Sequence, residues 1–427
     1  MKGKIRNARL VGITALSLMG GAAQAQTPAK GNVIVWMHAD NAKYFKTVAD
    51  NFMKANPEAK VTIREYPNEA YKTAIQVGVA SNQPPDVFFN WAGDDSFKFA
   101  RSNQVLDLTP YAQSAGWGKT LGKGALNAFS QDGKLWGAPF SQESKFFFYN
   151  KALLAKQGLK VPTSFSQLIG SCKTLKAKGI TPISFGNSER WPGVHYLTIL
   201  NQKVVGEKQT GLDYRLQASA DKLFTDAGYV RAFQMLKDMQ DAGCFNNAVN
   251  SVSPQIAEAT FYSGQAAMNF CGTWCINTMN TNGFKDKYGI FPFPRVEGGK
   301  GDQNYVIAGP IGLQISAKSQ NKPAAAAFVA FAVSRSSQIA LLADEKRIPV
   351  DAAAATTVKV EPIQAEAIAD LGKASGTALW LDTVLDNTIA EAYLNGIQEV
   401  LNGTKTPQQV VGVIRQAAIN AKQKLGR

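Results

Sequence analysis

GAPFSQESKFFFYN, residues 137–150, has the composition of a β-strand yet contains charged groups in its middle. The aromatic run at 146–149 is typical of a strand, and the glycine and proline at its start mark where it begins. Glu143 and Lys145 are costly inside such a strand unless they are paired or the strand crosses a wet cleft. Two interpretations follow: an edge strand with one solvated polar face, or a strand that crosses a cleft.

On the N-terminal side of this stretch, short strands alternate with helices. We expect strands at 32–37, 60–65 and 86–90, separated by helices at 42–56 and 68–81. This order predicts an α/β domain with a mostly parallel sheet, and ligands bind such sheets at the carboxyl ends of the strands. The first and third strands place these candidates there: Trp36, His38, Asp40, Asn41, Trp91, Asp94 and Asp95.

On the C-terminal side the pattern restarts, with helices expected at 164–178 and 229–242 and strands at 181–185 and 266–270. A second α/β domain is therefore predicted, as expected for a chain of about 400 mature residues, which exceeds what one hydrophobic core usually supports. Polar turns after its strands supply Glu189, Arg190, Trp191 and Trp274.

The last third of the chain adds one strand and a run of helices. The strand at 305–316, YVIAGPIGLQIS, is a natural second crossover between two lobes. Helices then close the chain as an all-helical tail, including one helix expected at 381–402. Trp380 and Asp382 at the start of that helix are further candidates for ligand contact.

Residues 1–25 are predicted to be a signal peptide that is removed on export, with a basic start, an apolar run at 10–21 and Ala-Gln-Ala at 23–25. Its loss removes four Lys and Arg side chains and no acidic ones, so the formal net charge falls from +14 to +10. No cysteine lies near the cleavage site, and no later apolar run is long enough to span a bilayer. We expect a free protein without a lipid anchor, periplasmic if the source has two membranes.

The remaining composition restricts the other kinds of partner. Lys and Arg are scattered rather than gathered into a stripe, which argues against nucleic-acid binding. An even number of cysteines in an exported chain predicts disulfides, with three full pairings possible. Cys172 and Cys244 each lie near the end of a predicted helix and form one candidate pair, while Cys271 is a possible partner for either. The spacing from Cys271 to Cys275 lacks companion ligands, so we expect no metal and no cofactor.

Stretches along the whole mature chain resemble one family. They are VIVWMHAD, FMKANP, PPDVFFNWAGDD, VLDLTP, DGKLWGAPFSQESKFFFYNKALL, KTLKAKGITPISFG, FYSGQAAMNFCGTW, YGIFPFPR and TALWLDTVLDNTIAEAYLNGIQEVLNGTKTPQQ. In this order the chain resembles the extracellular solute-binding proteins of ABC sugar importers, the maltose-binding-protein-like family. NWAGDD lacks an arginine that some maltodextrin-binding members carry nearby, so maltose itself is not implied.

The resemblance implies the two-lobed periplasmic binding protein fold of type II. The lobes would comprise 26–140 with 308–350, and 141–307 with 351–427, joined by crossovers near 139–143, 305–310 and 347–351. A monomer would hold a carbohydrate between its lobes and present it to the permease subunits of an ABC importer. On this pattern Glu143 faces the cleft. The other candidates line one lobe (Trp36, His38, Asp40, Asn41, Trp91, Asp94, Asp95), the other lobe (Glu189, Arg190, Trp191, Trp274) or come from the tail (Trp380, Asp382).

The residue types agree with a sugar, because hydroxyl groups need charged or bidentate partners and the C–H faces of sugars stack on aromatic rings. Each candidate also has a simpler alternative. Trp36 lies on a strand and could be core, Glu143 could pair with Lys145, and Arg190 could pair with Glu189. Asp94 and Asp95 could cap a helix, and His38 could be a structural imidazole.

Two other functions compete with sugar capture. A solute such as a polyamine or an organic acid would need a cleft of the opposite sign, so the charge of the lining residues discriminates between them. Paired carboxylates beside tryptophans are also the design of glycoside hydrolases. Nothing in the sequence fixes such a pair at catalytic separation, and no G-x-S-x-G, H-E-x-x-H or P-loop element is present. We therefore expect a binding protein and not an enzyme.

Overall fold

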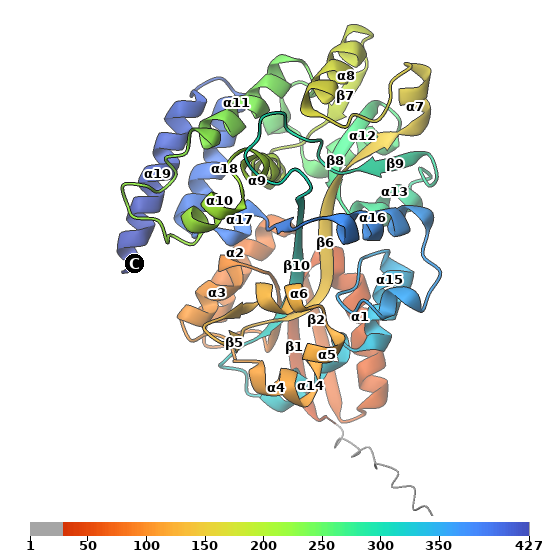
Figure 1. Ribbon diagram of the computed structural model, residues 1–427. Coiled ribbons are helices and arrows are strands. Elements are labelled where there is room, and N and C mark those ends of the chain that lie inside the picture. The colour runs from red at the N-terminus through yellow and green to blue at the C-terminus, as the bar shows by residue number, and fades with distance from the viewer. Residues whose placement is uncertain (1–28, 427) are drawn as a thin grey trace, which may run out of the picture.

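A computed structural model describes residues 29–426, which form two α/β lobes lying one above the other in Figure 1. The predicted signal peptide lies outside the described residues. We call the lobe that contains β1 to β3 the N-terminal lobe and the lobe that contains β7 to β9 the C-terminal lobe. Within residues 29–426 no single helix is long and apolar enough to cross a membrane, although α14 and α15 meet that test together as a pair bent by 56°.

One sheet runs through both lobes. Its strands, in spatial order, are β2 (Ala59–Tyr66), β1 (Gly31–His38), β3 (Val87–Trp91), β10 (Val306–Ile315), β6 (Ala138–Asn150), β8 (Ala266–Gly272) and β7 (Thr181–Ser184). Two more strands pair beside this path, β9 (Tyr288–Phe291) with β6 and β11 (Thr377–Ala378) with β10. The pairs β1–β2, β1–β3 and β7–β8 are parallel, as predicted, whereas β6 and β10 run antiparallel to their neighbours in the main path.

Strand β6 is the predicted strand at 137–150, and it crosses from one lobe to the other (Figure 1). Its first half, Ala138–Ser144, pairs with β10, and its second half, from Lys145 onward, pairs with β8. The interpretation as an edge strand with a solvated face is therefore wrong. β6 has partners on both sides and is buried along most of its length.

The carboxylate of Glu143 lies where β6 changes partners, and three segments donate hydrogen bonds to it. The donors are Ser141 Oγ at 2.8 Å, Thr273 Oγ1 in the turn after β8 at 2.6 Å, and Arg347 Nη1 after α15 at 2.9 Å. The side chains of Glu143 and Arg347 are only 3% and 7% exposed. Glu143 is thus paired with Arg347 and not with Lys145, whose Nζ lies 3.1 Å from His195 Nδ1 instead.

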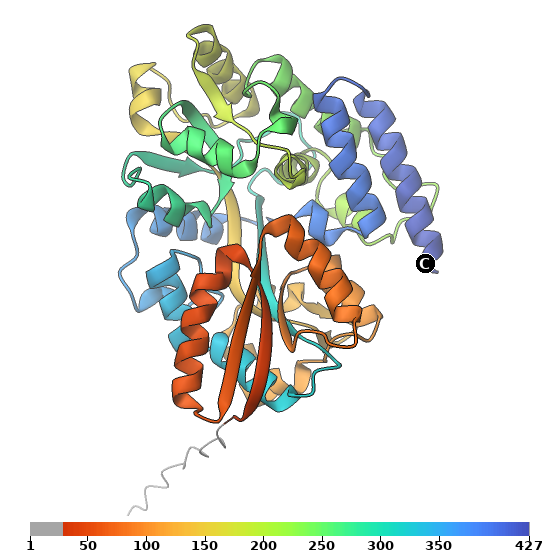
Figure 2. The same ribbon diagram turned by 180° about the vertical axis from the view of Figure 1, so that it is seen from behind.

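Each lobe has its own buried core. In the N-terminal lobe, helices flank the strands (Figure 2) and share a core with Phe45, Phe88 and Leu313. The helices and minor strands of this part are α1 (Ala39–Ala55), α2 (Asn68–Ala80), α3 (Asp94–Arg101), α4 (Thr109–Ser114), α5 (Trp117–Thr120), α6 (Lys123–Ala128), β4 (Ser130–Gln131), β5 (Lys134–Leu135), α14 (Lys322–Ala332) and α15 (Arg335–Glu345).

In the C-terminal lobe the core forms around Phe147, Tyr196 and Tyr393, and the helical tail packs into it. The helices of the rest of the chain are α7 (Lys151–Lys156), α8 (Phe165–Ala177), α9 (Trp191–Val204), α10 (Glu207–Tyr214), α11 (Ala227–Asp241), η1 (Val249–Ser251), α12 (Pro254–Tyr262), α13 (Cys275–Thr281), η2 (Ala354–Thr356), α16 (Pro362–Lys373), α17 (Leu381–Val384), α18 (Asn387–Leu401) and α19 (Pro407–Lys424).

The single helix expected at 381–402 is two helices. Asp386 takes an extended backbone conformation (φ −50°, ψ 140°), and its side chain accepts a hydrogen bond of 2.9 Å from the backbone N–H of Thr388. Asp386 therefore caps α18, because a capping carboxylate satisfies one of the free N–H groups at a helix start. The break separates α17, which reaches toward the other lobe, from α18, which packs in the core.

Two disulfides link the four cysteines. Cys172 on α8 is bonded to Cys244 after α11, which confirms the predicted candidate pair. Cys271 is bonded to Cys275 and to neither of the other two, so that bridge spans the end of β8 and the start of α13.

We expect Glu143→Ala to lose about 3–5 kcal/mol of unfolding free energy, because it leaves the buried Arg347 guanidinium without its carboxylate. Urea denaturation followed by circular dichroism measures the loss. The double variant Glu143→Ala/Arg347→Met removes both charges and should recover part of it. Wild-type stability in Glu143→Ala would show that the pair does not hold the crossover.

The two disulfides should differ in their contribution to stability, because the stabilisation grows with the length of the closed loop. With sequence separations of 72 and 4, replacement by alanine pairs should cost about 4 kcal/mol for Cys172–Cys244 and about 2 kcal/mol for Cys271–Cys275. Urea midpoints of the two double variants, compared under the same conditions, test this order. A larger loss for the short bridge would contradict it.

Candidate functional site

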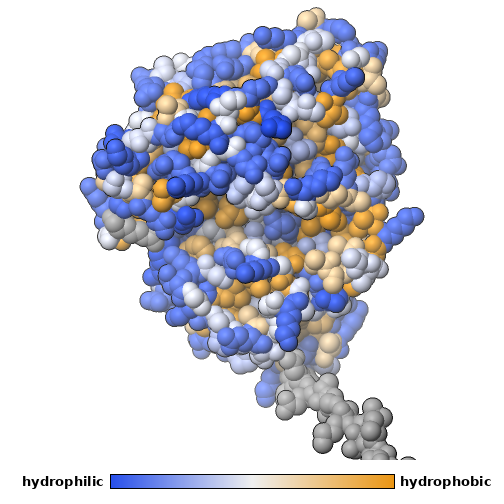
Figure 3. Space-filling view, in the orientation of Figure 1, coloured by the Kyte–Doolittle hydropathy of each residue, from blue (hydrophilic) through white to orange (hydrophobic). Residues whose placement is uncertain are grey.

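A cavity of about 450 Å³ lies between the lobes, within the range of small-molecule sites. On the N-terminal lobe its wall comes from the end of β1, the first turn of α1, the start of α2 and the end of β3. On the C-terminal lobe it comes from the turn before α9, from α12, from the turn after β8 and from α17. These are mostly the carboxyl ends of parallel strands, where the sheet topology predicts a ligand. Figure 3 shows one face of the molecule, which narrows between the lobes, with hydrophobic residues at that level.

The structure brings most of the residues predicted from the sequence to this cavity. Its wall includes His38, Asp40, Asn41, Trp91, Glu143, Glu189, Trp191, Trp274, Trp380 and Asp382. Both ring nitrogens of His38 have hydrogen-bond partners. Nε2 lies 3.2 Å from Asn68 Oδ1, and Nδ1 accepts a hydrogen bond of 3.2 Å from the backbone N–H of Asp40. Burial lowers the pKa of His38, so it presents a neutral ring.

Four predicted residues are not on the cavity wall, and two of them are Trp36 and Arg190. The ring of Trp36 packs against Tyr66, with ring centroids 5.2 Å apart. This agrees with the alternative interpretation of Trp36 as a packing residue and not a ligand contact. Arg190 forms an ion pair of 2.6 Å with Glu391 on α18, and not with the adjacent Glu189. Because the Arg190 guanidinium is paired with a residue of the helical tail, it is directed away from the cavity.

The other two are Asp94 and Asp95, which lie in the first turn of α3. Asp94 accepts two hydrogen bonds from Arg101, at 2.7 and 2.8 Å, and Asp95 accepts one from Lys98 at 2.5 Å. Carboxylates are favourable at a helix N-terminus, so local helix electrostatics accounts for both. Neither caps the helix, since the N-cap residue is Gly93.

Tryptophan rings form the apolar part of the wall on the C-terminal lobe. The centroid of Trp274 lies 6.2 Å from that of Trp191 and 5.8 Å from that of Trp380. The ring of Trp274 folds over Gly272, where a Cβ would come within 2.1 Å of it. Gly272 therefore has to lack a side chain for Trp274 to reach this position. On the N-terminal lobe, Trp91 lies with its centroid 5.8 Å from that of His38.

A row of charged and titratable groups runs from the cavity wall to the buried Lys145. Asp382 Oδ2 lies 3.7 Å from Lys72 Nζ, its Oδ1 lies 3.5 Å from His195 Nε2, and His195 Nδ1 contacts Lys145. Burial lowers the pKa of Lys145 to about 7, and burial together with Lys145 lowers the pKa of His195 to about 4. Burial raises the pKa of Asp382, but the nearby His195 and Lys72 outweigh this and leave it below its ordinary value. At neutral pH the row thus presents a neutral imidazole beside an ionised carboxylate.

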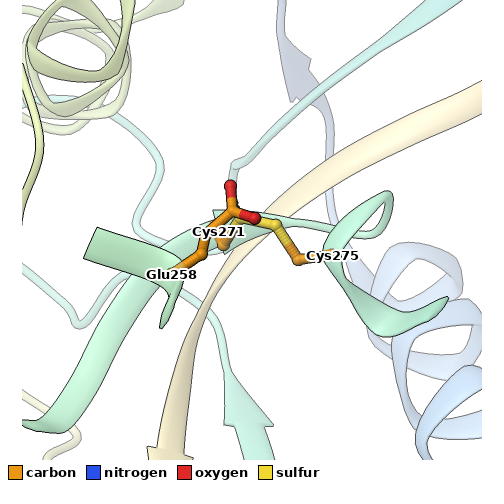
Figure 4. A group of neighbouring side chains, drawn as sticks. All are labelled: Glu258, Cys271 and Cys275. Atoms are coloured by element: carbon orange, nitrogen blue, oxygen red, sulfur yellow. A yellow bond between two sulfur atoms is a disulfide. The ribbon is translucent and has the colours of Figure 1, made fainter. Parts of the chain in front are cut away.

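Glu258 on α12 points toward the Cys271–Cys275 disulfide (Figure 4). Its Oε1 lies 3.7 Å from Cys271 Sγ, which has no proton to donate because it is bonded to Cys275. The three side chains are close enough to hold a metal ion, but sulfurs bonded to each other are not thiolate ligands. Burial, then the charge of Asp40, raises the pKa of Glu258 to about 7.

Sequence reasoning missed several residues of the wall: Asn68, Lys72, Gln255, Glu258, Tyr262, Asn277, Thr278, Glu345, Arg347 and Thr383. Asn68 and Lys72 start the helix after a strand end, so the rule that selected Asp40 could have found them. Arg347 lies in the expected third crossover but had no sequence signal for a partner. Glu258 sits on a helix that precedes a strand, where sequence does not tell which face meets the other lobe.

Comparisons with known proteins agree with this geometry. Residues 38–339 match the family model described as bacterial extracellular solute-binding protein. The multiple sugar-binding protein of Streptococcus mutans is 24% identical over 290 residues, 67% of each chain. An sn-glycerol-3-phosphate-binding periplasmic protein of Rhizobium meliloti is 25% identical over 325 residues, 70% of each chain.

Solved structures are similar over almost their whole length. One, reported in a study of xylan utilisation by Caldanaerobius polysaccharolyticus, is 28% identical with a TM-score of 0.83 and covers 90% of this chain and 99% of that one. A chitin oligosaccharide binding protein, 23% identical, has a TM-score of 0.85 and covers 92% and 99%. Since the family model matches most of the chain, this protein belongs to the bacterial extracellular solute-binding proteins.

Proposed function

We propose that this protein is the substrate-binding component of an ABC importer, capturing a di- or oligosaccharide between its lobes and delivering it to the membrane permease. The observation that carries the proposal is the interlobe cavity, where a wall of tryptophans adjoins buried carboxylates and amides. Stacking on aromatic rings and charged hydrogen bonds to hydroxyl groups are what a sugar requires.

Two of the relatives reported above are named for carbohydrates, and one, from Rhizobium meliloti, is named for sn-glycerol-3-phosphate. The relative from Streptococcus mutans is named for sugars, and one structural neighbour for chitin oligosaccharides. An organic acid is disfavoured by the cavity itself, since carboxylates outnumber cationic side chains on its wall. The hydrolase alternative is disfavoured by the family, which is named for binding a solute and not for a reaction, and by Glu143, which three donors hold in place. We therefore propose binding without turnover.

We further propose that the lobes comprise 26–140 with 308–350 and 141–307 with 351–427, and that they close by bending at crossovers near 139–143, 305–310 and 347–351. Support comes from the buried clusters, because residues from Ile311 to Val350 share a core with β1 and β3. Closure of two lobes around a ligand is a common hinge motion.

The family is extracellular, so the protein acts outside the cytoplasm. We propose that it does so as a free periplasmic monomer, released from its signal peptide and without a lipid anchor. The cavity is complete within one chain, which is what a monomer requires.

A thermal-shift screen of the mature protein against neutral saccharides, uronates, organic acids and polyamines should give its largest shifts with saccharides. A ligand present at 100 times its Kd adds about 2.7 kcal/mol to stability, which is easily resolved. Shifts with only organic acids or only simple polyamines would contradict the carbohydrate proposal.

Trp274→Ala should weaken binding of the saccharide found in that screen by at least about tenfold, because it removes the ring between Trp191 and Trp380. Isothermal titration calorimetry measures the change. Trp136→Ala is the matched control, since the Trp136 ring lies outside the cavity and donates to the backbone oxygen of Gln131. Equal affinity in the wild type and Trp274→Ala would remove Trp274 from the site.

A further inference from the structure

The cavity wall is acidic although the chain as a whole is basic, with a formal net charge of +14. The cationic side chains on the wall are Lys72 and Arg347. The acidic ones are Asp40, Glu143, Glu189, Glu258, Glu345 and Asp382. A chain with excess positive charge has thus placed an excess of negative charge where its ligand would lie.

Half of these carboxylates already have a cationic partner. Glu143 pairs with Arg347 at 2.9 Å, Asp382 with Lys72 at 3.7 Å, and Glu345 with Lys43 at 3.7 Å. Within residues 29–426, Asp40, Glu189 and Glu258 form no ion pair with a lysine or arginine. Two of them have other partners: Glu189 accepts from Trp191 Nε1 at 2.9 Å, and Asp40 lies 3.8 Å from the neutral His38 ring.

Glu258 is the least satisfied of the three. The neighbour at its carboxylate is a disulfide sulfur, which donates no hydrogen bond (Figure 4). Burial and the neighbouring charges of Asp40 and Glu189 outweigh the opposing charge of Lys145, which is the physical reason that the pKa of Glu258 rises to about 7. A cation beside Glu258 would offset these effects.

Independently of charge, the wall has buried acceptors that lack donors. Asn41 is 3% exposed, and its Oδ1 has no hydrogen-bond partner among the described residues. The Asp382 side chain is 7% exposed, and its Oδ1 lies 3.5 Å from His195 Nε2 but makes no hydrogen bond within the described residues. One belongs to each lobe, and both residues line the cavity. Buried acceptors are almost always satisfied, so these two indicate a ligand rich in donors.

From the acidic wall and the unsatisfied acceptors we infer that the captured carbohydrate is an amino sugar, whose protonated amine binds at Glu258 between Asp40 and Glu189. The inference rests on the proposed function and narrows it. An ammonium donates three hydrogen bonds and accepts none, whereas a hydroxyl donates one and accepts two, so the ammonium fits a wall of acceptors better.

The test compares sugars that differ at a single carbon. Calorimetric titrations at neutral pH would use glucosamine, N-acetylglucosamine and glucose, each as mono-, di- and trisaccharide, and the corresponding galacto and manno sugars. We expect the best amine to bind at least about tenfold more tightly than its acetylated and hydroxyl counterparts, as a hydrogen-bonded charge pair would give.

Glu258→Gln should weaken binding of the amine at least about tenfold and change binding of its neutral counterparts by less than about twofold. Glu65→Gln is the matched control, because its carboxylate is paired with Lys46 at 2.7 Å and does not line the cavity, and it should leave both unchanged. Neutral sugars that bind as tightly as their amines would overturn the amino-sugar inference and leave carbohydrate capture standing. Failure of every sugar to bind would overturn both.

Discussion

The buried ion pair between Glu143 and Arg347 is the contact on which the rest of the structure depends. Glu143 lies at the residue where β6 leaves one lobe for the other, and its partners come from β6, from the turn after β8 and from the segment after α15. Arg347 also donates to the backbone oxygen of Asp40 at 3.2 Å. A single carboxylate therefore ties the crossover strand to both lobes, and the cavity is built around it.

The cavity wall combines tryptophan rings that packing holds in place with polar groups, of which some have partners and others do not. Rings such as Trp274 are fixed by packing, here over Gly272, so they offer a surface that needs no ordering when a ligand arrives. The polar groups around them are unequal: some carboxylates pair with arginine or lysine, while Glu258 and Asn41 Oδ1 have no hydrogen-bond donor within residues 29–426. The carboxylates that have cationic partners hold the two lobes together, and the polar groups without partners are left to bind the ligand.

Local pattern was enough to predict the strands and the polar turns that follow them, because strand composition and strand-end position are both local properties. This is why β6, the polar residues that follow β1 and Trp274 are found from sequence. Partner choice is not local. Arg190 meets Glu391, 201 residues away, and Glu143 meets Arg347, 204 residues away, so neither pair could be predicted from neighbouring residues. Likewise, the break at Asp386 depends on a side-chain cap that competes with continuous helix periodicity.

The position of β10 has a consequence for how the chain folds. This strand lies between β3 and β6 in the sheet although it is made near the end of the chain, and Asn90 and Gln314, joined by a hydrogen bond of 2.7 Å, are 224 residues apart. The N-terminal lobe therefore lacks a central strand until about three quarters of the protein has been synthesised. Contacts of such high sequence separation form slowly. Until β10 emerges from the ribosome, the sheet of the N-terminal lobe is incomplete, and an incompletely folded lobe is what a translocation channel accepts.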